Sequence, residues 1–142
     1  MESPGLVLLV LKLMIAVNGL TGYAVPGDPP RVEFMPHDVL EGAACGGPCN
    51  VQGWYGGSRT IYLDDRLNPE ASLQDRGILV HELVHYMQEM GGAFGSAPSC
   101  ERWLEREREA YDVQRRWMLA NRRNGSAMRL ARLSRLHIDC EA

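Results

Sequence analysis

His81 and His85 stand four residues apart in the sequence His-Glu-Leu-Val-His, and Glu82 follows the first of them. On an α-helix, residues four apart lie one turn apart on the same face, so both imidazoles can reach a single ion. Neutral imidazole binds zinc at about 2.0–2.1 Å. Glu82 is poorly placed to be a ligand but can take a proton from a water on the open side of the metal. The pattern therefore predicts a hydrolytic zinc centre with one zinc per chain, in which Glu82 is the base.

The pattern lies in a predicted helix of about four turns, from near Asp75 to Met90. Apolar residues surround it on nearly all sides, which is typical of a buried helix, and Gly91 and Gly92 supply a stop signal. The alternative is a chance occurrence on an ordinary core helix, expected in about one chain of this size per few hundred. Histidines buried in that way need hydrogen-bond partners to offset desolvation.

A catalytic zinc usually has a third protein ligand. The extended pattern that ends in a third histidine is absent, because Gln88 and Gly91 stand where it has glycine and histidine. A second helix is expected after Ser99, a favourable N-cap residue. Antiparallel packing of this helix on the first would aim a carboxylate at the histidines from its acidic face, Glu101, Glu105 and Glu109. The alternative is a solvated face of ion pairs.

The histidine pattern, followed by a helical glutamate, resembles the gluzincin metallopeptidases, which include the thermolysin-like enzymes. Their third ligand is often followed by a small residue, as Glu109 is followed by Ala110. The resemblance implies Glu109 as the third ligand. Glu105 is the runner-up, because its spacing from His85 is nearer the thermolysin-like one, and we expect Glu107 to be a solvated surface charge.

A wider resemblance, over roughly residues 31–118, connects the chain with small, uncharacterised bacterial metallopeptidase-like proteins. It implies a fold and a metal site but no substrate. The segments that carry it are Cys45–Cys49, Gly53–Tyr55, Ile61–Asp65, the His81 helix and Arg106–Tyr111.

Residues 58–64 are rich in β-branched and aromatic side chains and predict a strand, and Arg31–Phe34 predict another. We expect a compact α+β, zincin-like domain, with a small, mostly antiparallel sheet packed on the two helices. By resemblance, the strand over residues 58–64 forms the upper edge of the site, where an extended peptide can bind. The residues of this segment are equally consistent with a strand that only covers the helix.

Stabilisation of a developing oxyanion requires a nearby hydrogen-bond donor. Asp112 is a candidate for orienting a metal-bound histidine, although the resemblance places an acid one residue later, at Val113. The oxyanion candidates, none singled out by spacing, are Tyr62, Tyr86, Tyr111 and His137.

Residues 5–20 are apolar and predict a signal peptide, cleaved near Ala24, ahead of a single domain over residues 25–142. We expect a periplasmic or secreted protein; a membrane anchor and an N-terminal core helix are the alternatives. Four cysteines fit export and predict two disulfides, with Cys45–Cys49 and Cys100–Cys140 as the local pairing. A thiolate metal site is the alternative.

The chain has a net charge of −3, but residues 115–135 contain seven arginines and no acid. Contact of this Arg-rich segment with an anionic lipid or nucleic acid is one interpretation, and we favour a solvated helix packed on the domain. No nucleic-acid fold signature is present. The residues together predict a monomeric zinc metallopeptidase, with a peptide substrate implied by resemblance. The alternative is a non-catalytic, exported metal-binding or interaction domain stabilised by disulfides.

Overall fold

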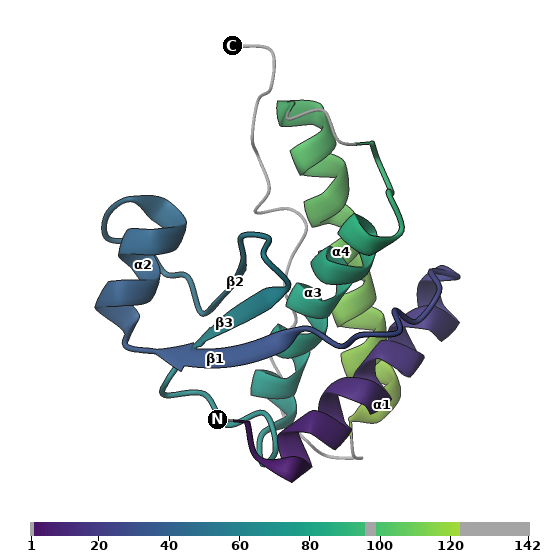
Figure 1. The fold of residues 1–142 in the computed structure, drawn as a ribbon, viewed down its shortest axis with the longest axis horizontal. Helices are drawn as coiled ribbons and strands as arrows, with labels where there is room; N and C mark the ends of the chain where they lie inside the picture. The colour runs from purple at the N-terminus through teal and green to yellow at the C-terminus, as the bar shows by residue number, and fades with distance from the viewer. Residues whose placement is uncertain (1, 96–98, 123–142) are drawn as a thin grey trace.

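The computed structural model describes residues 2–95 and 99–122. Helices and a small sheet occupy separate parts of the fold, which confirms the α+β class (Figure 1). The elements in chain order are α1 (Pro4–Thr21), β1 (Arg31–Met35), α2 (His37–Cys45), β2 (Gly53–Tyr55), β3 (Thr60–Asp64), α3 (Leu73–Met90) and α4 (Cys100–Asn121). Sequence patterns predicted β1, β3, α3 and α4, whereas α2 and β2 were not expected.

The sheet has the order β1-β3-β2, with β1 parallel and β2 antiparallel to β3. It is therefore mixed, and the prediction of a mostly antiparallel sheet was wrong. The chain passes through α2 and β2 before it returns to the sheet, and this long connection allows β1 and β3 to run in parallel. The strand predicted over residues 58–64 is β3 and lies at the centre of the sheet, whereas β2 is an outer strand.

Helix α3 begins where Ser72 accepts a hydrogen bond from the backbone N–H of Asp75, and it ends before Gly91. Helix α4 begins in the same way at Ser99, whose hydroxyl accepts from the N–H of Arg102. Each hydroxyl satisfies a backbone donor that a helix start leaves without an intrahelical partner. The predicted start of α3, near Asp75, is confirmed to within two residues, and its predicted end at Met90 is confirmed.

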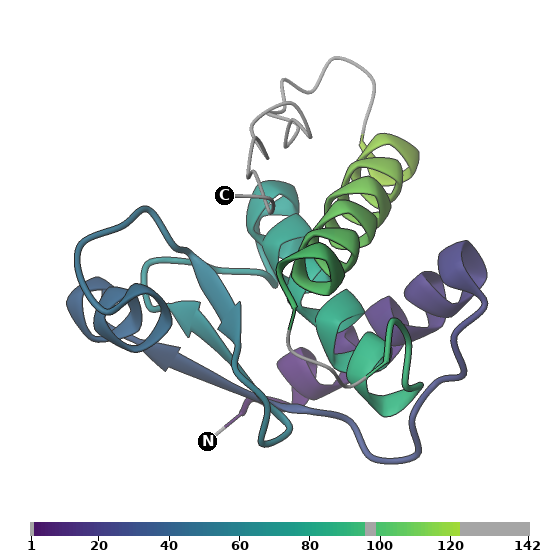
Figure 2. The ribbon, with the colours of Figure 1, turned by 90° about the horizontal axis from the view of Figure 1, so that it is seen from above.

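Helices α3 and α4 pack side by side and antiparallel (Figures 1 and 2). His81, early in α3, contacts Gln114, late in α4, whereas Gln88 contacts the earlier Arg106. Near the crossing, a β-carbon added to Gly77 would lie 2.6 Å from the sulfur of Met118. Glycine at this position allows the two helices to approach closely, and the approach fixes the register of the acidic residues of α4 opposite the histidines of α3.

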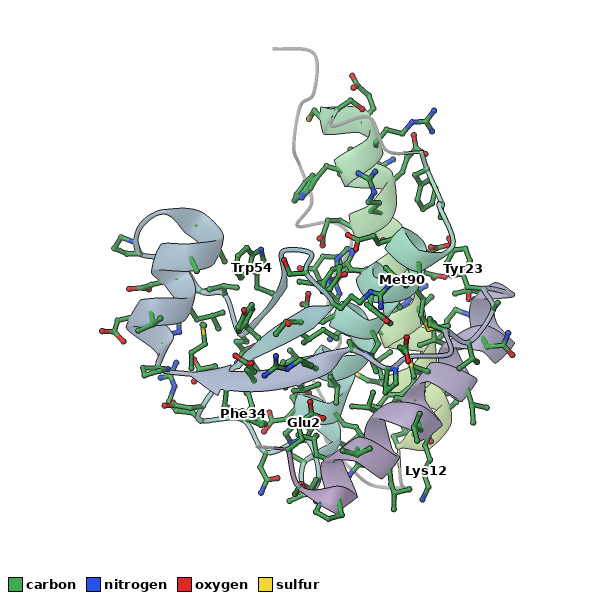
Figure 3. The ribbon with its side chains drawn as sticks, viewed as in Figure 1. Glu2, Lys12, Tyr23, Phe34, Trp54 and Met90 are labelled. Atoms are coloured by element: carbon green, nitrogen blue, oxygen red, sulfur yellow. A yellow bond between two sulfur atoms is a disulfide. The ribbon has the colours of Figure 1, made fainter. Side chains whose placement is uncertain are left out.

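Figure 2 shows α1, α3 and α4 gathered on one side of the sheet and α2 on the other. The buried side of α1 belongs to the same hydrophobic core as α3 and α4, although Leu8 and Ile15 on its outer side are exposed. Lys12 extends from α1 away from the body of the protein (Figure 3). Among the described residues, α1 is the one helix long and apolar enough to cross a membrane. Export and cleavage near Ala24 stay predictions, as do the membrane-anchor and core-helix alternatives.

A disulfide joins Cys45 at the end of α2 to Cys49 in the following loop, as predicted. The second predicted pair includes Cys140, which lies outside the described residues. His137 and most of the Arg-rich segment also lie outside them.

Candidate metal centre

Three side chains from the two antiparallel helices direct nitrogen and oxygen atoms at one point. The Nε2 atoms of His81 and His85 lie 3.2 Å apart. Glu107 reaches across from α4, with Oε2 3.2 Å from Nε2 of His81 and Oε1 2.8 Å from Nε2 of His85. Within the described residues, this is the group of histidine and acidic side chains spaced closely enough to hold a metal ion.

The spacing of these donor atoms can be compared with that required by zinc. Tetrahedral zinc with bonds of about 2.0–2.1 Å has neighbouring donor atoms about 3.3 Å apart. The two imidazole nitrogens lie 3.2 Å apart, close to that edge length, and each has one of the two Glu107 oxygens at 3.2 or 2.8 Å. Two imidazole nitrogens and a carboxylate oxygen are also the donor set of many catalytic zinc sites. The residues present could therefore hold a metal ion, and their donor types suit zinc.

The position of Glu107 corrects the sequence-based assignment of the third ligand. Its side chain is only 17% exposed, so it is not the solvated surface charge that we expected. Glu109 instead accepts hydrogen bonds from Tyr23 and Gln88, and the exposed Glu105 pairs with Arg102. The expectation relied on the small residue after Glu109, whereas the helix register decides which carboxylate faces the histidines.

The sequence of α4 contains a pattern that indicates which of its glutamates lies on the buried face. The buried face of α4 contains Ala110, Val113 and Trp117, spaced three and four residues apart. One turn further toward the N-terminus, this stripe reaches Glu107, three residues before Ala110. Continuing the apolar stripe would therefore have identified Glu107 as the glutamate on the buried face.

The donor atoms of the site also interact strongly with one another. Burial alone would raise the pKa of the Glu107 carboxyl, but hydrogen bonds and charge attraction from both histidines hold it below its usual range. Burial alone would lower the pKa of His85, yet the carboxylates of Glu107 and Glu82 outweigh it and raise that pKa to about 9. Protons and a metal cation therefore compete for the same position between these side chains.

Glu82 is 6% exposed and lies under the outer strand β2. Its carboxylate accepts a hydrogen bond from the backbone N–H of Tyr55. A β-carbon at Gly53 would lie only 3.2 Å from a carboxylate oxygen of Glu82, so the strand can pass this close because Gly53 has no side chain. Burial raises the pKa of Glu82, although both histidines and the Tyr55 N–H act in the opposite direction. A carboxyl with a raised pKa is suited to accepting and returning a proton.

Two buried glutamines hold the far sides of the imidazoles, and the sequence patterns did not identify them. Oε1 of Gln114 lies 3.0 Å from Nδ1 of His81, and Oε1 of Gln88 lies 3.0 Å from Nδ1 of His85. An acceptor at Nδ1 keeps the proton there and leaves the Nε2 lone pair free for a metal. Both histidines are therefore oriented with Nε2 toward the common point.

The remaining candidates from the sequence lie in different places. The ring of Tyr111 packs edge-on against His81, with centroids 4.4 Å apart, so Tyr111 borders the site. Asp112 forms ion pairs with Arg115 and Arg116 instead of orienting a histidine, so that expectation was wrong. Two tyrosines are engaged elsewhere: Tyr62 stacks on Trp54, and Tyr86 donates to the backbone oxygen of Asp28.

Comparison with protein-family models, with curated proteins and with solved structures finds no match for this chain. Inference about its function therefore depends on the geometry and chemistry of the site.

Proposed function

We propose that this protein is a zinc-dependent peptidase in which His81, His85 and Glu107 hold the metal and Glu82 is the general base. The observation that carries the proposal is the convergence of three side chains, each with a donor atom within 4.8 Å of the others, beside a buried carboxylate outside that donor group. A metal site with a purely structural role does not require a carboxylate base at that position. It is also usually closed by four protein ligands, whereas this group has three within the described residues.

When bound, zinc would act as a Lewis acid that polarises the scissile carbonyl and acidifies water. Glu82 would accept a proton from the attacking water and return it to the leaving amine nitrogen. Its raised pKa, caused by burial, favours the first of these steps. The Tyr55 N–H would hold the carboxylate in place during both.

A peptide substrate is supported by the position of β2 as well as by the gluzincin resemblance. Strand β2 has β3 on one side only, and its Gly53 backbone lies against Glu82. An outer strand offers main-chain donors and acceptors to an extended chain. A peptide bound along β2 would bring its carbonyl groups near the base and the metal ligands. The tyrosine that borders the site, Tyr111, is the described candidate for an oxyanion donor.

The test is hydrolysis of a mixed peptide library by the zinc-loaded protein and by the Glu82→Gln variant. Glutamine keeps the shape of glutamate but cannot take a proton, so the variant should bind zinc normally and lose at least about 100-fold in kcat. Glu89→Gln is a control, because Glu89 lies on the same helix and contacts the exposed Tyr55 hydroxyl. Hydrolysis by Glu82→Gln at the wild-type rate would refute the assigned base.

Two competing accounts predict different results in the same experiment. In a hydrogen-bonded His–Glu cluster without a metal function, the wild-type protein binds no zinc after metal-replete preparation. In a non-catalytic metal-binding domain, the wild-type protein binds zinc but cleaves no peptide in the library. Either outcome rejects the peptidase proposal.

A further inference from the structure

Beyond the ligands, a chain of hydrogen bonds runs from His85 to the segment that follows α1. Nδ1 of His85 faces Oε1 of Gln88 at 3.0 Å, and Nε2 of Gln88 donates to Oε1 of Glu109, also at 3.0 Å. The same Glu109 oxygen accepts from the Tyr23 hydroxyl. Tyr23 lies beside the end of α3, near Met90 (Figure 3), and within 4.0 Å of the position that a β-carbon on Gly91 would occupy.

The direction of the Gln88 amide is determined by its surroundings. An amide has a donor end and an acceptor end, and exchanging them reverses every hydrogen bond it makes. The NH₂ group of Gln88 faces two acceptors, the Glu109 carboxylate and, at 3.0 Å, the backbone oxygen of Arg106. A flipped amide would place its oxygen against both of them. Gln88 is therefore held with its oxygen toward His85, and at 1% exposure it has little access to water as a substitute partner.

We propose that Glu109 is a positioning residue of the metal centre, which acts through Gln88 to fix the protonated nitrogen of His85. With an acceptor at Nδ1, His85 keeps its proton there and presents the Nε2 lone pair to the metal. Tyr23 fixes Glu109 in turn, and so connects the N-terminal segment to the site. The role of this series of hydrogen bonds in metal binding rests on the proposed function, whereas its hydrogen bond to the His85 ring is present without a metal.

The test measures two quantities for each variant: zinc affinity by competition with a chromophoric chelator, and the hydrogen bond of the His85 Nδ1–H group, by the NMR chemical shift and solvent-exchange rate of that proton. The NMR spectra are recorded on metal-free protein at neutral pH, where Nε2 of His85 faces the Glu107 carboxylate and Nδ1 faces the Gln88 oxygen. Glu109→Ala should lower zinc affinity about 10–100-fold, the usual cost of losing a partner that orients a ligand. It should also weaken the Nδ1–H hydrogen bond of His85, so that this proton exchanges faster with water than in the wild type.

A conservative variant separates this role from simple packing. Glu109→Gln keeps an oxygen that can accept from the Gln88 NH₂ group and the Tyr23 hydroxyl, and should retain a zinc affinity within about tenfold of the wild type. Gln88→Glu places a carboxylate against both the Glu109 carboxylate and the Arg106 backbone oxygen, and should weaken zinc binding. Glu105→Ala is the matched control, because Glu105 is exposed on the same helix and should leave both measurements unchanged. If Glu109→Ala does not fold, Tyr23→Phe removes only the hydroxyl and should shift both measurements in the same direction.

An unchanged Nδ1–H hydrogen bond of His85 and unchanged zinc affinity in both Glu109→Ala and Tyr23→Phe would overturn the inference. So would a zinc affinity in Glu109→Gln as low as that in Glu109→Ala. If the wild type binds no zinc, the proposed function fails, and the Nδ1–H hydrogen bond in the metal-free variants still decides whether Glu109 positions His85.

Discussion

Two clusters in this protein each combine histidine with carboxylates, and their geometries differ. In the candidate metal centre, the Nε2 atoms of His81 and His85 converge on Glu107. In the second cluster, which we call the His37 clamp, Nδ1 of His37 faces Asp64 at 2.9 Å and Nε2 faces Glu41 at 3.0 Å. The two nitrogens of one ring point in different directions, so these carboxylates cannot share a single ion with the ring.

The two clusters also differ in the hydrogen-bond partners that surround them. In the metal centre, neutral amides hold both Nδ1 atoms and leave the converging side free for a cation. In the His37 clamp, Asp64 already accepts hydrogen bonds from the side chain and the backbone N–H of Arg66. Nε2 of His37 also contacts the backbone oxygen of Cys49. The His37 clamp therefore fastens α2 and its loop to β3. The two clusters have similar residue types, and the convergence of donor atoms on one point is what makes the His81 cluster the candidate metal site.

The sharpest way to break this comparison is to remove one histidine from each cluster. His81→Ala should lower zinc affinity by more than about 100-fold, beyond the usual effect of residues that only orient a ligand. His37→Ala should leave zinc affinity unchanged. Titration with a zinc-selective chelator measures both, and similar losses in the two variants would remove the distinction.

Proton competition should set the pH dependence of metal binding. The pKa of His85 is raised to about 9 by Glu107 and Glu82, and the ring must lose a proton before it binds zinc. Affinity should therefore increase about tenfold per pH unit between pH 6 and 8, with about one proton released per zinc. Calorimetry in buffers of different ionisation enthalpy counts that proton. Zinc binding that is independent of pH over this range would contradict the competition.

In the metal-free protein, the raised pKa of His85 makes the folded state more stable at low pH, whereas zinc binding is favoured at high pH. Because the folded pKa of His85 exceeds the unfolded value of 6.5, the protonated ring stabilises the metal-free protein fully below pH 6.5. This contribution should disappear as the pH rises through about 9. Urea unfolding of metal-free wild type and His85→Gln should therefore differ less at pH 10 than at pH 6. A difference that grows with pH would reverse the assigned sign.

We expect the His37 clamp to contribute to the free energy of unfolding and not to zinc affinity. Asp64 is 1% exposed, and hydrogen bonds from Arg66, outweighing burial, hold its pKa below its usual range. Asp64→Asn should lower the free energy of unfolding by about 1–3 kcal/mol, the cost of leaving buried polar groups with poor partners. The loss should be present at pH 7 and shrink as the pH falls below the unfolded pKa of 3.8 toward the lower folded pKa, because Asp64 is protonated in the unfolded protein before it is protonated in the folded one. Urea unfolding at several pH values tests this, and zinc affinity should stay unchanged.

The smallest expected effect is that of the Cys45–Cys49 disulfide. Because the bridge closes a loop with a sequence separation of only 4, reducing it should cost about 2 kcal/mol or less. The disulfide neighbours the His37 clamp, since Cys49 contacts both His37 and Glu41. Thermal unfolding of Cys45→Ser/Cys49→Ser and the wild type measures the loss. A loss of zinc binding in this variant would connect two regions that we describe as separate.

The sequence predicted what depends on neighbours within one helix, and less of what depends on packing. The spacing of His81, Glu82 and His85 follows from one helical turn, and the serine caps of α3 and α4 are equally local. The choice among the glutamates of α4 depends on its rotation against α3, which is set by contacts such as Gly77 with Met118. A preference based on the residue after Glu109 could not reveal that rotation.

The sheet shows the same limit. Alternating and β-branched residues identified β1 and β3, but pairing depends on how far the chain travels between strands. The insertion of α2 and β2 between them allows that pair to be parallel, and β2 lies outermost. Glycine, tryptophan and tyrosine in β2 carried too short a pattern to predict a strand, although this strand lies over Glu82.

Zinc content most directly tests the assignment of His81, His85 and Glu107 as one metal site. It is measured by native mass spectrometry on metal-replete wild type, Glu107→Ala and the exposed control Glu105→Ala. We predict one zinc per chain in the wild type and in Glu105→Ala, and none in Glu107→Ala. Zinc-free wild type, or Glu107→Ala that retains a full zinc ion, would contradict the account.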